Sequence, residues 1–144
     1  MSSTSPLAAT LPTVQPDDPG ARLLLFGLRQ MGAHGLNDAC AAHAFVTAFG
    51  KGFQRPLVLL RTLVAEMSAG SSRPIPIAPW CCPRMTAAEA TLLDILGRTR
   101  DNPIVAALLL GDLLGIREPI GILATAHALA NAFADMGLPL DSQD

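Results

Sequence analysis

The sequence predicts an all-α protein, a compact bundle of five to six short helices with an extended, proline-rich connector at about residues 69–85. Three observations carry this prediction. Apolar residues recur at helical spacing in six separate segments, and no segment alternates apolar and polar residues as a half-buried strand does. Capping residues and prolines precede these segments, and glycines follow most of them. The length suits one domain, so we expect residues 18–138 to form a single helical domain.

The first predicted helix begins at Asp18 and Pro19, because aspartate favours the N-cap and proline the first helical position. It runs to about residue 33. Arg22 and Arg29 lie seven residues apart, so we expect both to mark the solvent side of this helix.

Two more helices precede the connector. Asn37 is expected to cap a helix over residues 39–49, and Pro56 to open a helix that ends near Ser68. The four prolines of the connector forbid a helix there; they are Pro74, Pro76, Pro79 and Pro83. We expect its apolar residues, Trp80 among them, to lie against the helical body.

Three helices follow the connector. Thr86 and Glu89 have the spacing of a capping box, in which the threonine hydroxyl and the glutamate carboxylate each accept an amide of the other residue. Further helices are predicted over residues 103–114 and from Pro119 to about Gly137. The helix over 103–114 is apolar almost all round, which predicts that neighbours surround it.

The composition predicts association. Half of the residues are hydrophobic and only 15% are charged, well below the roughly 25% of ordinary domains. One copy would expose apolar patches that monomers rarely carry, so we expect a homodimer or a second protein to cover them. The residues expected to form this interaction surface are Leu109, Leu113, Ala124, Ala128 and Trp80.

The charge of the chain and its lack of recognisable targeting signals limit the partners and the compartment that we expect. The net charge is −2 and Lys51 is the only lysine, so we do not expect nucleic-acid binding. Neither an export signal nor an apolar run of about 18 residues is present, and three cysteines give no disulfide framework. We therefore expect a cytoplasmic protein without membrane contact. Residues 1–17 and 139–144 are expected to be flexible.

Five residues are candidates for ligand or metal binding. Cys81 and Cys82 are adjacent, and such a pair can bind a metal or haem or take part in thiol chemistry. Cys40 and His43 share a helix face, and His34 lies in the preceding turn, so these three could complete a mixed site. The alternative is that the cysteines only pack, and no cofactor is predicted outright.

The sequence contains no nucleophilic serine motif, phosphate-binding glycine loop or di-metal helix motif, which favours a non-enzymatic role. We expect a helical interaction or regulatory protein, the alternative being a metal-, haem- or thiol-redox protein that uses Cys81 and Cys82. The runs RLLLFGLRQMGAHGL at 22–36 and IAPWCCPRMT at 77–86 resemble a small family of uncharacterised helical proteins of alphaproteobacteria. This resemblance implies a bacterial cytoplasmic protein and assigns no activity.

Overall fold

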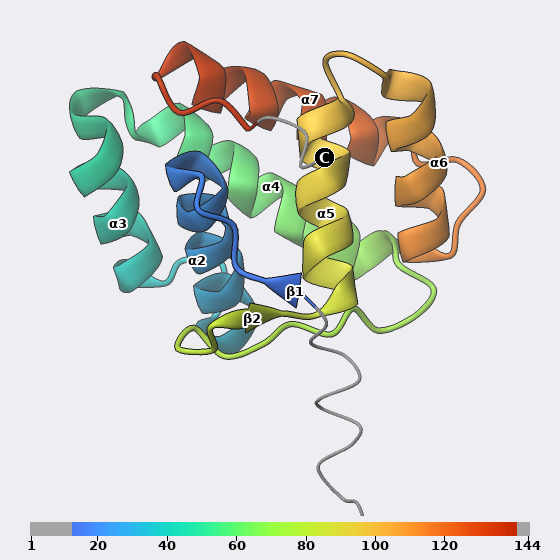
Figure 1. Cartoon of the computed structure of the whole chain (residues 1–144), viewed down its shortest axis with the longest axis horizontal. Helices are drawn as coiled ribbons and strands as arrows, with labels where there is room; N and C mark the ends of the chain where they lie inside the picture. Colours follow the sequence, from blue (N-terminus) through green and yellow to red (C-terminus); the bar gives the residue numbers. More distant parts are fainter. Residues whose placement is uncertain (1–12, 141–144) are drawn as a thin grey trace, which may run out of the picture.

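The computed structural model describes residues 13–140, and this part of the chain contains six α-helices and one pair of very short strands (Figure 1). The predicted all-α fold with an extended connector is confirmed. In chain order the elements are β1 (Thr13–Val14), α2 (Pro19–His34), α3 (Ala39–Phe49), the 3-10 turn η1 (Gly50–Gly52), α4 (Gln54–Gly70), β2 (Arg84–Met85), α5 (Ala87–Arg98), α6 (Pro103–Leu114) and α7 (Ile120–Asp135).

The helix starts follow local side-chain chemistry. The Asp18 carboxylate accepts the amide of Ala21 at 2.9 Å, and the capping box of Thr86 and Glu89 is formed in full. The cap of α3 is Asp38 and not Asn37, so that prediction was wrong by one residue. A carboxylate at the N-cap gains from the positive end of the helix dipole, which an amide does not.

Two helices cross the others and hold the bundle together. Figure 1 shows α7 crossing the top of the molecule and α4 running diagonally below it, behind α5, while α2, α3, α5 and α6 stand more steeply. The helices α4 and α7 run antiparallel, because Gly52 lies against Met136 and Gly70 against Ile122. Between them and α3, three phenylalanine rings pack edge to face with centroids 5.2–5.8 Å apart, which are those of Phe45, Phe49 and Phe133.

Both ends of the described chain are packed. Residues 13 and 14, which we expected to be flexible, form β1 and pair antiparallel with β2. Two residues give no periodicity, so the sequence did not indicate this strand. Leu140 is buried, and the Leu138 carbonyl lies so close to Gly20 that a Cβ there would come within 2.7 Å of its oxygen. The rest of the predicted flexible segments, residues 1–12 and 141–144, lies outside the described residues.

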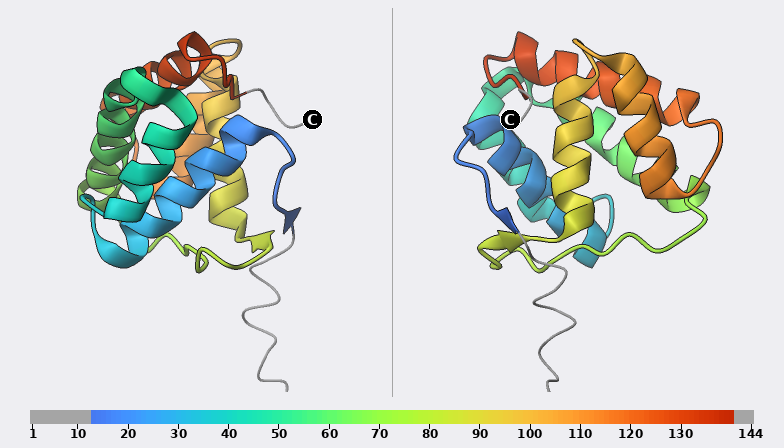
Figure 2. Two further views of the ribbon diagram at one scale, coloured as in Figure 1. Left: turned by 90° about the vertical axis from the view of Figure 1, so that its left-hand side faces the viewer. Right: turned by 45° about the vertical axis from the view of Figure 1, so that its right-hand side comes forward.

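The connector runs along one edge of the molecule from the end of α4 to β2 (Figures 1 and 2). Ile75 and Ile77 pack against the core as expected. The expectation was wrong for Trp80, whose side chain is 61% exposed. The amide of Cys82 donates to the carbonyl of Pro79 at 3.0 Å, and the turn closed by this bond leaves the tryptophan outside the core.

The prediction of a fully surrounded α6 was also wrong. This helix lies at the outer edge of the molecule and packs on α5 and α7 (Figure 1). Ala106, Leu110 and Leu114 are buried, whereas Ile104 and Leu108 are 75% and 69% exposed. Within residues 13–140, no helix combines the length and the apolar character that crossing a membrane requires.

The close approach of α2 to α3 and α4 generates a stability prediction. A Cβ at Gly27 would lie 2.8 Å from Leu60 Cδ2 and 3.0 Å from Phe45 Cε1, both in the core. We expect Gly27→Val to lower the free energy of unfolding by about 2–3 kcal/mol, because overpacking a dense core forces strain. Gly121 has open space around its Cα, so Gly121→Val should change it by less than about 0.5 kcal/mol. Urea unfolding followed by circular dichroism measures both, and equal losses would contradict the packing argument.

Candidate functional site

A buried ion pair joins α2 to α5. Arg29 Nε donates to Glu89 Oε2 at 2.9 Å and Nη2 donates to Oε1 at 3.0 Å, with side chains 1% and 0% exposed. The expectation that Arg29 faces solvent was therefore wrong. Its position four residues after buried Leu25 was the available signal, because residues four apart share a helix face.

The same two side chains also hold the connector. Arg29 donates to the carbonyls of Cys82 and Arg84, both at 2.8 Å. Glu89 accepts the amides of Ala78 at 3.1 Å and Thr86 at 2.9 Å. An isolated buried charge is very unfavourable, and this dense set of hydrogen bonds is what makes the buried pair tolerable. The pair therefore fixes the connector at both sides of its turn.

This turn, residues 79–82, presents Trp80 and Cys81 to solvent. Behind it, Gln15 Nε2 donates to the Cys82 carbonyl at 2.6 Å, and the Gln15 amide donates to Pro83 at 3.1 Å. The β1–β2 pair continues this attachment. The turn thus holds an exposed tryptophan on a fixed backbone, and tryptophan is enriched among residues that dominate binding energies, which makes the turn a candidate contact site.

A hollow of about 510 Å³ lies between this turn and α2. We call it the turn hollow. Its cationic lining comes from Arg22 and Arg29 of α2, and no aspartate or glutamate lines it. The remaining side chains that matter for recognition are Leu23, Phe26, Trp80 and Cys81.

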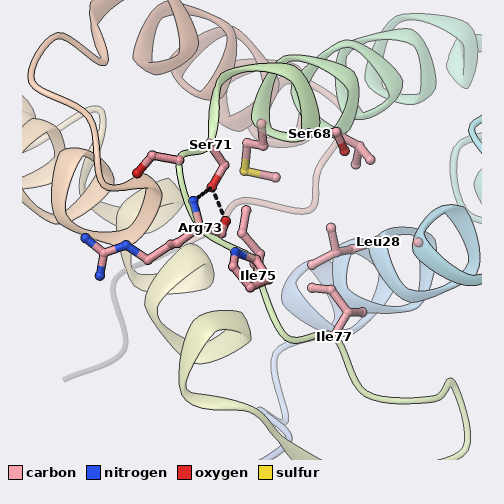
Figure 3. A pocket seen from close by; sticks show the side chains of 11 residues that line it. Leu28, Ser68, Ser71, Arg73, Ile75 and Ile77 are labelled. Carbon is pink, nitrogen blue, oxygen red and sulfur yellow. Dashed lines mark hydrogen bonds between the residues drawn. The ribbon is translucent and has the colours of Figure 1, made fainter.

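A larger cavity of about 680 Å³ lies on the other side of the connector, between α2 and α4. Its apolar wall includes Leu28, Ile75 and Ile77, and its polar rim includes Ser71 and Arg73 (Figure 3).

The polar groups of this larger cavity already serve the fold. The Ser71 hydroxyl donates to the carbonyl of Arg73 and accepts its amide (Figure 3). The Ser72 hydroxyl donates to the carbonyl of Gly115 at 2.8 Å. The Arg73 side chain points away from Leu28 and Ile77 in Figure 3, and a Cβ at Gly115 would lie 2.8 Å from its Nε. Few polar groups remain to orient a ligand, so the turn hollow is the better candidate site.

The structure does not gather the predicted metal ligands. Cys40 and Cys81 are exposed, Cys82 is half-buried, and all three are free thiols. His34 and His43 are exposed on α2 and α3. Among residues 13–140, no three histidine, cysteine, aspartate or glutamate side chains are grouped so that they could hold a metal ion.

The predicted interaction residues fall into two groups. Trp80 and Ala124 are exposed, whereas Leu109, Leu113 and Ala128 are half-buried, and both leucines pack against the core. Sequence reasoning missed the exposed Ile104 and Leu108. Their i, i+4 spacing could have identified a second apolar face of α6, but both faces of this helix are apolar, so periodicity does not say which one is covered.

The buried ion pair generates a second prediction. Glu89→Gln leaves the Arg29 charge uncompensated and turns an amide NH₂ toward N–H donors, so we expect a loss of about 3–5 kcal/mol in unfolding free energy. Arg55 and Asp135 form an exposed pair at 3.1 Å, with side chains 59% and 65% exposed, which makes Arg55→Gln the control. Its loss should stay below about 1 kcal/mol. Chemical unfolding measures both, and a Glu89→Gln loss as small as the control would overturn the role given to the pair.

Comparisons with known proteins identify a family for the chain but indicate no activity. Residues 3–133 match the model of a family described as a family of unknown function, DUF6628. No curated protein and no solved structure matched the chain. The match spans most of the sequence and agrees with the resemblance to a helical family of unknown activity, so the chain belongs to the DUF6628 family.

Proposed function

We propose that this protein is a non-enzymatic helical interaction protein that works by self-association through α6. The observation that carries the proposal is the exposure of Ile104 and Leu108, one helical turn apart on the outer face of α6. Large aliphatic side chains that remain in water lose the hydrophobic stabilisation that burial would give, so a surface that covers them is favoured.

The shape beside Leu108 supports a second copy as the occupant. A shallow hollow of about 400 Å³ adjoins this side chain, with Ala107, Gly111 and Ile116 among the residues that line it. Small side chains at 107 and 111 let another helix approach closely. A twofold arrangement would insert Leu108 of each copy into the hollow of the other, and twofold dimers are the commonest assemblies.

Charge at this face suits an interface rim. Arg73, Asp112 and Arg117 line the same hollow together with apolar residues, and interfaces combine charged and apolar groups in this way. Covering Ile104 and Leu108 on two copies contributes on the order of 6 kcal/mol, which is comparable to the cost of association. We therefore expect a weak, reversible dimer and not a permanent one.

The alternative role for Cys81 and Cys82, as metal, haem or thiol-redox residues, has no observation of comparable weight in residues 13–140. We propose that the protein acts in the cytoplasm, because three free cysteines, two of them exposed, suit a reducing compartment.

Self-association is tested by sedimentation of the purified protein over a concentration series. We expect the average mass to rise from 15.0 kDa toward twice this value as the concentration approaches about 100 μM. Leu108→Glu should remain monomeric throughout, because it places a charge at the centre of the contact. Val58→Glu is the control, since Val58 is 52% exposed on α4, away from α6.

Circular dichroism of both variants confirms that they fold. A wild-type protein that stays monomeric at every concentration contradicts the proposal. A dimer that survives Leu108→Glu, or that Val58→Glu weakens equally, contradicts the assignment to α6.

A further inference from the structure

The turn hollow has a composition that the proposed function does not use. Two arginines line it, no carboxylate does, and its apolar walls include two aromatic rings. We infer that the turn hollow binds a small organic anion with a flat apolar body, such as an aromatic carboxylate. Its volume of about 510 Å³ is within the range of small-molecule sites.

Arg22 supplies the free positive charge. It is exposed at the end of the first turn of α2, and it forms no ion pair with any residue that the structure describes. An arginine fork matches a carboxylate with two parallel hydrogen bonds. Because no acidic side chain lines the hollow, nothing within it competes for this fork.

Arg29 also lines the hollow, but its side chain is only 1% exposed and already serves the fold. A guanidinium has five N–H groups. The contacts described for Arg29 use one from Nε, one from Nη1 and two from Nη2. These bonds hold the guanidinium in place beneath the hollow. Glu89 balances the charge of Arg29, so the attraction for an anion comes from Arg22.

The apolar walls select the body of the ligand. Phe26 is half-buried on α2 and Trp80 stands on the turn, and both line the hollow with Leu23. Aromatic rings favour stacked or edge-on contact with another ring. The backbone that carries Trp80 is fixed by Arg29 and Gln15, so little ordering is needed when a ligand enters.

Trp80 makes binding measurable. It is the only tryptophan, and the chain has no tyrosine, so fluorescence excited at the indole band reports on the turn hollow alone. We would titrate the full-length protein with phenylacetate, which carries a ring and a carboxylate. We expect saturable change in Trp80 emission with a dissociation constant of about 0.1–1 mM. Phenylacetamide, the neutral analogue, should bind at least about tenfold more weakly, and acetate should leave the emission unchanged.

Two variants of equal charge change locate the site. Arg22→Gln should weaken phenylacetate binding about tenfold, while Arg100→Gln, which removes an exposed arginine that does not line the hollow, should leave it unchanged. Bound phenylacetate should also slow alkylation of Cys81 by iodoacetamide and leave Cys40 unaffected, because only Cys81 lines the hollow. Mass spectrometry of the labelled peptides separates the two.

Three results would overturn the inference. They are no emission change up to about 20 mM phenylacetate, equal binding of phenylacetamide, and equal weakening by Arg22→Gln and Arg100→Gln. The monomeric Leu108→Glu variant should bind phenylacetate like the wild type, so a failure at the turn hollow and a failure of self-association are distinguished.

Discussion

The contact between Arg29 and Glu89 organises one whole side of this molecule. It replaces water around two full charges, which is unfavourable unless other polar groups take the place of the solvent. Here those groups are backbone carbonyls and amides of the connector, a segment too rich in proline to satisfy itself with a helical ladder. The connector backbone supplies hydrogen bonds to the buried charges, and the charges supply hydrogen bonds to the connector backbone. That mutual dependence holds the backbone on both sides of the 79–82 turn.

The sequence predicted the elements that local chemistry decides and missed those that distant partners decide. The capping box at Thr86 and the proline start of α6 involve neighbours within four residues, and both were found. Arg29 was misplaced because its partner lies sixty residues away. For α6, the apolar pattern predicted the helix but not how much of it is buried, because burial depends on whether another element covers its outer face. The candidate hollow could not be predicted, because it needs α2 and the turn together.

The two surfaces are independent parts of one scaffold. Figure 1 shows α6 at one side of the molecule and the 79–82 turn, in lime green, at the other. Between them stand α5 and the buried ion pair. A second copy on α6 would leave the turn hollow open to solvent, so the proposed assembly and the proposed ligand binding do not exclude each other. Coupling between them would require α5 to shift, and the Glu89 carboxylate on this helix is held by four hydrogen bonds.

The contact between Gly20 and the Leu138 carbonyl brings the beginning of the first helix next to the segment after the last. The backbone of the domain thus forms a nearly closed ring. A domain whose ends lie this close together tolerates circular permutation, in which the old ends are joined and the chain is cut elsewhere, because each residue keeps the same neighbours in space. Joining the old ends with a short tether and cutting the chain at an exposed bend, such as residues 100–101, would give new termini there, and with them new attachment points for fused reporters.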